Sequence, residues 1–170
     1  MGEKLSEARK IGLPMVARAD ARLFILGSLP GDASLSASRY YAHPTNQFWR
    51  LLGRAIGEDL QRLDYDARLE VLAGRRIGLW DVIGAARRSG SLDQAIRDAE
   101  HNQLNRLIAD FPLLRAIAFN GATASVAGRR LLTDQSSIAS IDLPSSSAAN
   151  TAPFALKSER WASLRDYCAD

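Results

Sequence analysis

The stretch that decides the fold reads LFILGSLPGDASLSASRYYAHPTNQFW and runs from residue 23 to residue 49. It opens with an unbroken apolar run over residues 23–26, which is typical of a strand buried on both faces of a parallel sheet. The run ends in GSLPG, where Gly27 and Gly31 allow the backbone to approach a ligand closely and Pro30 stiffens the turn. This pattern predicts a strand that stops at a functional loop.

The second half of the same stretch gathers polar and aromatic side chains just before a helix. Tyr41, His43 and Asn46 lie close together in the sequence. A helix is predicted over residues 46–57, because its apolar residues recur at the spacing of one helical face. Thr45 is the expected N-cap. Asn46 is therefore expected at the entrance of the helix, beside the glycine loop.

Strands and helices alternate along the rest of the chain, which predicts an α/β fold, a three-layer sandwich with a short four-stranded parallel sheet. Ligands bind such sheets at the carboxyl ends of the strands, where the glycine loop, Asp81, Asn120 and Pro144 all fall. We expect one domain over residues 1–170, with a loosely ordered segment over residues 1–19. The predicted strands cover residues 23–26, 77–83, 114–119 and 137–143. The predicted helices cover residues 46–57, 64–73, 102–111, 122–132 and 154–168. A loop is predicted over residues 84–92 and a short helical turn over residues 92–99.

Composition narrows the classes of function. The 170 residues are 46% apolar and 24% charged, as in an ordinary globular protein, and the net charge of +3 permits nucleic-acid binding without requiring it. Cys168 is the single cysteine, so an intrachain disulfide, a cysteine-ligated iron–sulfur cluster and a zinc finger are excluded. We expect no metal and no cofactor. No apolar run is long enough to span a membrane and no signal peptide is evident, so a cytoplasmic protein is expected.

Three segments together resemble the uracil-DNA glycosylase superfamily. They are GSLPG at residues 27–31, YYAHPTNQFW at residues 40–49 and LPSSSAAN at residues 143–150. The resemblance covers roughly residues 20–168, and it is strongest to the hypoxanthine-DNA (deoxyinosine) glycosylase branch, which is related to the mismatch-specific uracil glycosylases. It implies an enzyme that takes a damaged nucleotide out of the DNA stack and cleaves its N-glycosidic bond.

The resemblance also implies roles for individual residues. In the superfamily an Asp or Asn inside the glycine loop positions the attacking water, and Leu29 occupies that place here. In the hypoxanthine branch the Asn of the Ala-His-Pro-x-Asn segment is expected to take over, so Asn46 is the candidate catalytic residue. Its carbonyl can orient a water and its NH₂ group can donate to the leaving base. The family stacks an aromatic ring on the flipped base, a role that falls to Tyr41. His43 is expected to be a structural histidine.

Two further residues are candidates for reading the base. Hypoxanthine and uracil share an edge with a ring carbonyl beside a ring N–H, and the amide of Asn120 complements that edge. Asp81 could accept from the N–H but would repel the carbonyl when ionised. It also stands where uracil glycosylases have an Asn, and the sequence leaves open which residue reads the base. The residues expected to contact the base are Gly27, Ser28, Leu29, Pro30, Tyr41, Phe48, Asp81 and Asn120.

The serine-rich segment resembles the second motif of the superfamily, a loop that pinches the DNA backbone. Many members begin this loop with a histidine that stabilises the departing base, and Leu143 takes its place here. Hydroxyl and backbone N–H groups can bind phosphate without net charge, and adjacent arginines either bind phosphates or are only solvated. The residues expected to contact DNA are Pro144, Ser145, Ser146, Ser147, Arg87 and Arg88.

These observations predict a monofunctional glycosylase, because neither motif holds a lysine that could form a Schiff base. The preferred substrate is deoxyinosine, with deoxyuridine second, in double-stranded DNA, while action on single strands stays open. A monomer is expected. The alternatives are a mismatch-specific uracil or thymine glycosylase, a damage-binding module that has lost catalysis, and a hydrolase of free nucleosides.

Overall fold

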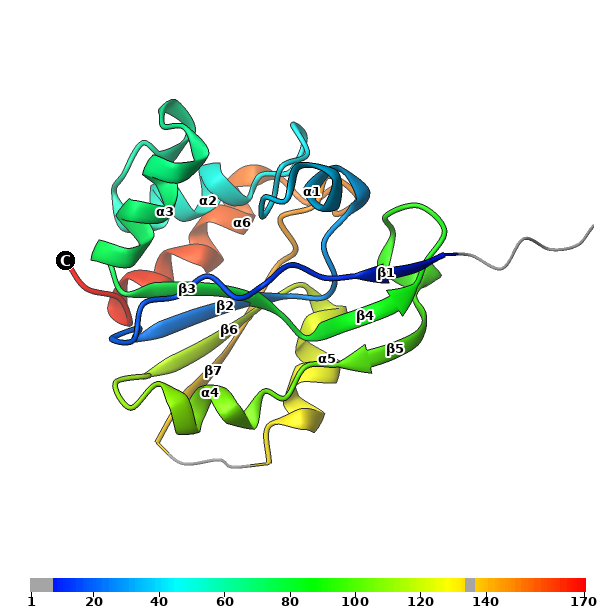
Figure 1. Cartoon of the computed structure of the whole chain (residues 1–170). Helices are drawn as coiled ribbons and strands as arrows, with labels where there is room; N and C mark the ends of the chain where they lie inside the picture. The colour runs from blue at the N-terminus through cyan, green and yellow to red at the C-terminus, as the bar shows by residue number, and fades with distance from the viewer. Residues whose placement is uncertain (1–7, 134–136) are drawn as a thin grey trace, which may run out of the picture.

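The centre of the molecule is a parallel sheet with the strand order β3-β2-β6-β7 (Figure 1). The computed structural model describes residues 8–133 and 137–170. The predicted α/β fold and its four-stranded parallel sheet are confirmed. The strands of this sheet are β2 (Leu23–Gly27), β3 (Ile77–Asp81), β6 (Ala116–Asn120) and β7 (Ala139–Leu143).

Helices cover both faces of the sheet, because successive side chains of a strand point to opposite faces. Leu23 and Ile25 pack into one apolar core, and Phe24 and Leu26 pack into the other. Figure 1 shows the resulting three layers, with α2, α3 and α6 on one side of the sheet and α4 and α5 on the other. These helices are α2 (Phe48–Ile56), α3 (Tyr65–Gly74), α4 (Asn105–Asp110), α5 (Ala122–Leu131) and α6 (Phe154–Trp161).

A second, antiparallel sheet, which the sequence did not predict, lies beside the first. Its strands are β1 (Arg9–Ile11), β4 (Ile83–Arg87) and β5 (Arg97–His101), in the order β1-β4-β5. The strand predicted over residues 77–83 therefore ends at Asp81, and the chain turns at Val82 into β4. Residues 83–87 and 97–101 are strands rather than a loop and a helical turn. The helical turn is confined to Asp93–Ala95.

The beginning of the described chain is held by both sheets. Arg9–Ile11 pairs with β4, and Val16 forms a bridge with Leu79 of β3. The loose order expected over residues 1–19 is thus wrong for this part, while residues 1–7 lie outside the described residues. In the part of the chain that the structure describes, no helix is long and apolar enough to cross a membrane.

The segment between β2 and α2 also differs from the prediction. It contains a short helix, α1 (Asp32–Ala37), which the polar sequence did not indicate. Helix α2 begins at Phe48, and its N-cap is Gln47, so Thr45 is not the cap. The buried face of α2 is the predicted one and ends at Ile56. The last predicted helix is α6 followed by a 3₁₀ helix (Ala162–Asp166), and another 3₁₀ helix (Leu60–Arg62) precedes α3.

Candidate active site

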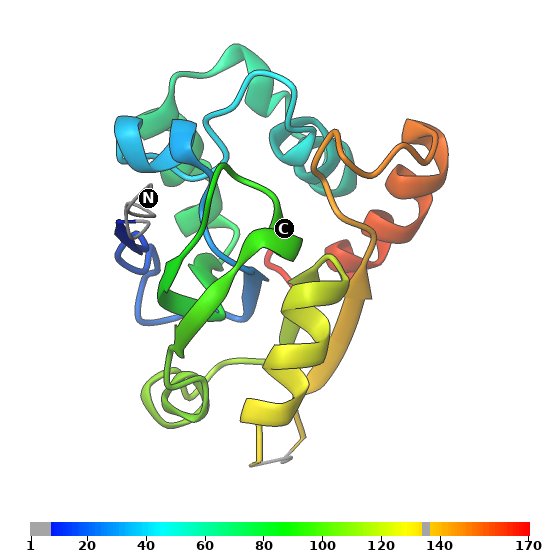
Figure 2. The same ribbon diagram turned by 90° about the vertical axis from the view of Figure 1, so that its right-hand side faces the viewer.

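A cleft of about 690 Å³ lies at the carboxyl ends of the parallel strands. Figure 2 shows the orange segment that follows β7 beside helix α2, and the backbone N–H of Gln47 donates to the Ser146 carbonyl where the two meet. Most residues predicted to contact the base or the DNA line this cleft, although they come from distant parts of the sequence. They are Gly27, Ser28, Leu29, Pro30, Tyr41, Asn46, Asp81, Asn120, Ser145, Ser146 and Ser147.

A chain of hydrogen bonds joins the two candidate asparagines through a buried serine. The Nδ2 group of Asn120 donates to Oγ of Ser146 over 2.9 Å, and the Ser146 hydroxyl donates to Oδ1 of Asn46 over 2.8 Å. The backbone N–H of Ser146 donates to Oδ1 of Asn120 over 2.9 Å. The carbonyl of Ser146 accepts from the N–H of Gln47, which ties the loop to the start of α2. The side chains are thus fixed before any ligand arrives.

This arrangement leaves Asn46 as a donor. Its Oδ1 accepts from the Ser146 hydroxyl and also from the backbone N–H of Phe48 over 3.0 Å, which occupies both lone pairs. The Nδ2 group has no hydrogen-bond partner among the described residues, and Asn46 lines the cleft. Hydrogen bonds accepted by an amide oxygen polarise the amide and strengthen its N–H donors. The predicted orientation of water by the carbonyl is not supported, because that oxygen is engaged.

Asn120 is engaged in the same way and more completely. Its oxygen holds the Ser146 N–H, and its Nδ2 donates to Ser146 and, over 3.3 Å, to the hydroxyl of Tyr41. A side chain with its oxygen and both N–H bonds occupied cannot read a base unless it breaks internal bonds. Ser146 lines the cleft, but it is 1% exposed and its hydroxyl is bonded to both asparagines, which does not favour the predicted contact of this side chain with DNA. Both residues instead hold Asn46 and Tyr41 in place.

The Asp81 carboxyl, unlike the Asn120 amide, is not satisfied by hydrogen bonds within the described structure. Its side chain is buried at 4% exposure and lines the cleft, and its Oδ2 has no hydrogen-bond partner within residues 8–133 and 137–170. The carboxyl lies over the Cα of Gly27, the neighbouring residue in β2, where a Cβ would come within 2.7 Å of Oδ1. Burial, aided by the nearby carboxylate of Asp93, raises the pKa of Asp81 to about 7, and Arg88 opposes this rise. Gly27 is therefore needed to make room for an uncompensated acid.

Asp93 is a cleft residue that the sequence analysis missed. It begins the 3₁₀ turn between β4 and β5, and its Oδ1 accepts a hydrogen bond of 2.6 Å from the Ser28 hydroxyl. The surrounding sequence is polar and carries no motif, so only the pairing of β4 with β5 brings Asp93 to the cleft. Two carboxyl groups, those of Asp81 and Asp93, thus lie on the side of the cleft away from the asparagines.

Tyr41 presents an aromatic face to the cleft from a constrained backbone. Its φ of 53° lies in the left-handed region, which is uncommon for a residue with a side chain. Phe48 stacks beneath the ring with centroids 3.7 Å apart and an angle of 6° between the planes. A flipped base could stack only on the opposite face. Phe48 is fully buried and does not line the cleft, so its predicted direct contact with the base is wrong.

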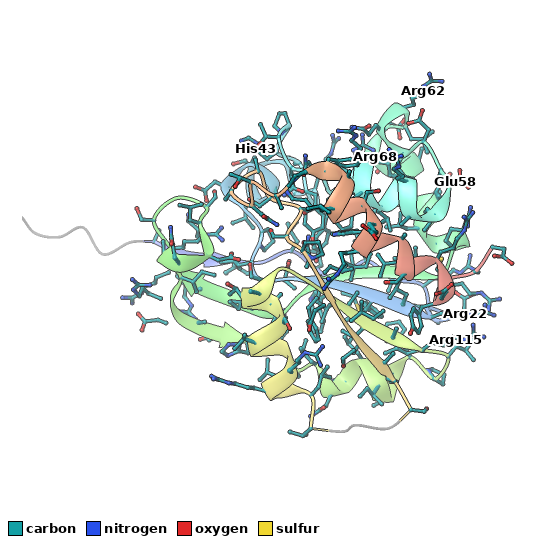
Figure 3. The ribbon with its side chains drawn as sticks, turned by 180° about the vertical axis from the view of Figure 1, so that it is seen from behind. Arg22, His43, Glu58, Arg62, Arg68 and Arg115 are labelled. Carbon is teal, nitrogen blue, oxygen red and sulfur yellow. The ribbon has the colours of Figure 1, made fainter. Side chains whose placement is uncertain are left out.

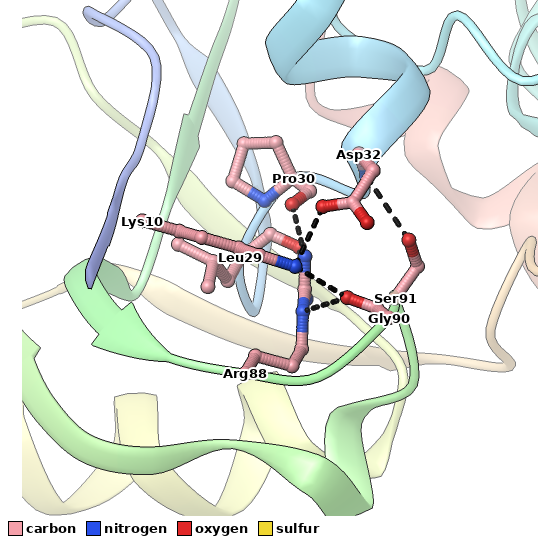
Figure 4. A network of polar contacts seen from close by, with 7 residues as sticks. All are labelled: Lys10, Leu29, Pro30, Asp32, Arg88, Gly90 and Ser91. Atoms are coloured by element: carbon pink, nitrogen blue, oxygen red, sulfur yellow. Dashed lines mark hydrogen bonds and ion pairs between the residues drawn. The ribbon is translucent and has the colours of Figure 1, made fainter. Parts of the chain in front are cut away.

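The Arg88 side chain supports the glycine loop from behind (Figure 4). It is 1% exposed and donates to the carbonyls of Leu29, Pro30 and Gly90, so the predicted contact of Arg88 with DNA is wrong. Lys10 of β1 also connects these segments, because its Nζ donates to the Gly90 carbonyl and to the Asp32 carboxylate, each over 2.7 Å.

Leu29 extends the same support with apolar contacts. Its side chain packs against Ile83 and Ala86 of β4. The position that holds a polar residue in other superfamily members therefore serves here to join the glycine loop to the second sheet.

The serine-rich loop is held by a buried lysine that the sequence did not single out. Lys157 of α6 is 2% exposed, and its Nζ donates to Gln47 Oε1 over 2.9 Å and to the carbonyls of Asn150 and Ser147. Ser145 and Ser147 stay half-buried at the cleft, where they can still meet a phosphate. Pro144 does not line the cleft, and its carbonyl accepts from the Trp161 indole.

Two other predicted residues lie at the surface. His43 is exposed at the cleft rim (Figure 3), and its Nδ1 lies 3.1 Å from the backbone nitrogen of Thr45, which donates to it. Arg87 is exposed, does not line the cleft, and lies 3.9 Å from the Asp98 carboxylate. Arg22 and Arg115 precede β2 and β6, so they lie at the other, amino end of the sheet (Figure 3).

The chain is similar in sequence to known DNA glycosylases. The sequence model of the uracil DNA glycosylase superfamily matches residues 14–165. A hypoxanthine DNA glycosylase of Methanosarcina barkeri is 50% identical over 113 residues, which are 66% of this chain and 72% of the relative. Its counterpart from Methanosarcina acetivorans is 48% identical over 115 residues, 68% of this chain and 73% of the relative.

The fold comparison gives the same answer. A solution NMR structure from Methanosarcina acetivorans, described as a candidate uracil DNA glycosylase, superposes with a TM-score of 0.83 at 41% identity. The superposition covers 94% of this chain and 99% of the other. The family match spans both cleft motifs and all four parallel strands. The chain therefore belongs to the uracil DNA glycosylase superfamily.

Proposed function

We propose that this protein is a monofunctional DNA glycosylase that removes hypoxanthine from deoxyinosine in DNA and leaves an abasic site. One observation carries the proposal: Ser146 fixes the side chain of Asn46 in the cleft that Tyr41 also lines, and the Asn46 NH₂ group has no hydrogen-bond partner among the described residues. The Methanosarcina relatives named hypoxanthine DNA glycosylase support the choice of base.

The geometry suits the cleavage of an N-glycosidic bond. The flipped base stacks on the open face of Tyr41, which contributes on the order of 1–3 kcal/mol. As the bond breaks, negative charge develops on the departing base, and a preorganised donor stabilises it without reorganisation. Asn46 supplies this donor. Ser145 and Ser147 hold the DNA backbone at the mouth of the cleft, and His43 lies where it can add a contact from the rim.

A lyase reaction is not part of the proposal, because it needs a free amine at the cleft. The described residues contain two lysines. Lys157 Nζ is surrounded by three oxygen atoms, and Lys10 Nζ is bound to Asp32 and Gly90. Neither amine is available to attack the sugar.

Uracil is a second candidate base, since its edge has the same carbonyl and N–H as hypoxanthine. A mismatch-specific uracil or thymine glycosylase is less well supported, because Leu29 is packed in an apolar cluster and cannot position water. A damage-binding module without activity would not need the Asn46 amide. We further propose that the protein acts as a single-domain monomer on double-stranded DNA in the cytoplasm.

The test is a single-turnover assay on labelled duplexes that each contain one inosine, uracil or xanthine. Hot alkali reveals abasic sites, and borohydride trapping reveals a Schiff base. We expect rapid release of hypoxanthine, slower release of uracil, and no trapped complex. Release of uracil alone would replace the proposal by the mismatch-uracil alternative. Tight binding to inosine DNA without release of any base would replace it by the damage-binding alternative.

A further inference from the structure

Asp81 is a polar group of the cleft whose purpose the hydrogen bonds of the described residues do not explain. Asn120 and Asp81 both end strands of the parallel sheet and both suit the edge of a deaminated base. Asn120 has its oxygen and both N–H bonds engaged, whereas Asp81 has an oxygen that is buried and unpaired. A buried polar atom without a partner is rare and costs stability, so its presence points to a ligand. Asp81 is therefore the group left to meet the base.

We propose that Asp81 acts as a neutral carboxylic acid, whose O–H donates to the ring carbonyl of the flipped base and whose C=O accepts from the adjacent ring N–H. A neutral acid offers one donor and one acceptor, the same pair as an amide. An ionised carboxylate has no donor and would repel the carbonyl. The inference rests on the proposed glycosylase function and names the group that reads the base.

The surroundings of Asp81 favour the neutral form. Its carboxyl is buried against Gly27, and no cation of the described part of the chain forms an ion pair with it. The charged groups that bear on it are Asp93, which disfavours ionisation, and Arg88, which favours it but is committed to three backbone carbonyls. The neighbouring Tyr40 and Tyr41 hydroxyls stay neutral, because burial raises the pKa of each well above its usual range. A carboxyl in such a site can be kept protonated near neutral pH and can donate a hydrogen bond.

The same proton has a second use in the reaction. As the glycosidic bond breaks, the carbonyl oxygen of the base gains negative charge, and a donor aimed at it lowers the barrier. Leu143, at the start of the serine loop, is buried and apolar and cannot provide such a donor. The O–H of Asp81 supplies it from the opposite side of the cleft, and the proton stays on Asp81 as the hydrogen bond strengthens. Ionisation of Asp81 then removes binding and catalysis together.

The experiment compares Asp81→Asn with Asp81→Leu, which has a similar shape but no polar atoms. Single-turnover release of hypoxanthine is measured from about pH 5.5 to about pH 9.5. For the native protein we expect release to fall about tenfold per pH unit above about pH 7. For Asp81→Asn we expect slower release than native at low pH, no such fall, and faster release than native at the highest pH. Asp81→Leu should lose release at every pH.

A third variant checks the direction of the effect. Asp93→Asn removes the negative charge that disfavours ionisation of Asp81, so the fall in release should begin at a lower pH than in the native protein. Ser28→Ala removes the hydrogen bond to Asp93 but keeps the charge, and its profile should begin to fall near the native pH. Infrared difference spectra of the DNA-free protein should contain a protonated carboxyl band that Asp81→Asn lacks. This readout does not depend on activity.

The outcomes separate the two proposals. If the native protein releases hypoxanthine with a pH profile that matches that of Asp81→Asn, the role of Asp81 is overturned and the glycosylase function stands. If Asp81→Asn is folded but inactive at every pH, the amide-like reading of the base is also overturned. If the native protein releases no base at any pH, both proposals fail, even when the infrared band shows a protonated Asp81.

Discussion

The two sides of the cleft differ in how their polar groups are satisfied. On one side Asn120 and Ser146 satisfy each other, and Ser146 and Phe48 satisfy the Asn46 oxygen. On the other side Asp81 is buried with an unpaired oxygen, and Asp93 adds a second acid. The first side is rigid before the DNA arrives, and the second is incomplete until it does. The comparison separates side chains with an unpaired polar group, which we propose meet the ligand, from side chains whose hydrogen bonds hold their neighbours in place.

The largest effect should come from Asn46, whose NH₂ group has no hydrogen-bond partner among the residues that the structure describes. Asn46→Ala removes the NH₂ group aimed into the cleft and should reduce single-turnover release of hypoxanthine by about 10²–10³-fold. Its affinity for inosine-containing DNA should change little, because Tyr41 and the serine loop remain. Gel-shift titration beside the cleavage assay checks both. Equal losses of binding and cleavage would show that Asn46 only shapes the loop, and the distinction between the two sides would fail.

On the side of the cleft that holds Asp81, the unpaired carboxyl should make the free energy of unfolding depend on pH. The pKa of Asp81 is raised from 3.8 to about 7 by folding, so its contribution to stability is fully present below about pH 4 and is lost as the pH rises towards 7. Asp81→Asn removes this loss. We expect the variant to be more stable than native by about 2 kcal/mol at pH 8, after allowing for its own unpaired amide, and similar near pH 4. Urea unfolding at both values measures this, and a difference that does not change with pH would mean that Asp81 is ionised when folded.

The rigid side depends on a single hydroxyl. Ser146→Ala leaves Asn46 with one hydrogen bond fewer and Asn120 with one of its two acceptors lost, which should destabilise the fold by about 1–3 kcal/mol and slow base release roughly tenfold. Ser163→Ala is the matched control, since Ser163 does not line the cleft and its hydroxyl donates locally to the Arg160 carbonyl. Thermal unfolding and the cleavage assay should separate the two variants. Equal behaviour would show that the loop backbone, not the hydroxyl, holds the asparagines.

The smallest effect should come from an arginine on the protein surface outside the cleft, and it concerns DNA binding. Arg87 is exposed, and if it meets a phosphate, Arg87→Ala should weaken DNA binding slightly and reduce the slope of log K against log salt by about 1. Arg22→Ala, at the opposite end of the sheet, should leave the slope unchanged. Fluorescence anisotropy at several salt concentrations makes this comparison. An unchanged slope in both variants would mean that Arg87 is only solvated and contacts no phosphate.

The parallel sheet was predictable because its strands are buried on both faces and therefore read as apolar runs. Residues 23–26 and the glycine loop after them decided the fold. The antiparallel sheet was not predictable, because β4 consists largely of small residues and the sequence of β5, Arg-Asp-Ala-Glu-His, is charged and exposed. Its stability comes from pairing with distant segments, which leaves no periodicity in the sequence.

The members of the cleft were predictable and their roles were not. The carboxyl ends of parallel strands converge, so Asp81 and Asn120 were expected together. Which one is free depends on Ser146, a contact partner far away in the sequence. The pair Arg87 and Arg88 shows the same limit, since the two look alike in the sequence. One is exposed, and the other is buried because backbone carbonyls on a loop 58 and 59 positions away accept its hydrogen bonds.

The hydrogen bond between Ser146 and Asn46 spans 100 positions of the chain. Contacts across such a separation close a long loop and form slowly compared with local ones. The amide of Asn46 therefore acquires its fixed orientation only when β7 has docked beside β6 and carried Ser146 into place. A chain that is still folding therefore lacks the fixed amide that we propose stabilises the departing base. Release of a base thus becomes possible only after the fold is complete. A partly folded chain would then bind DNA without producing abasic sites, which are themselves DNA damage until other enzymes repair them.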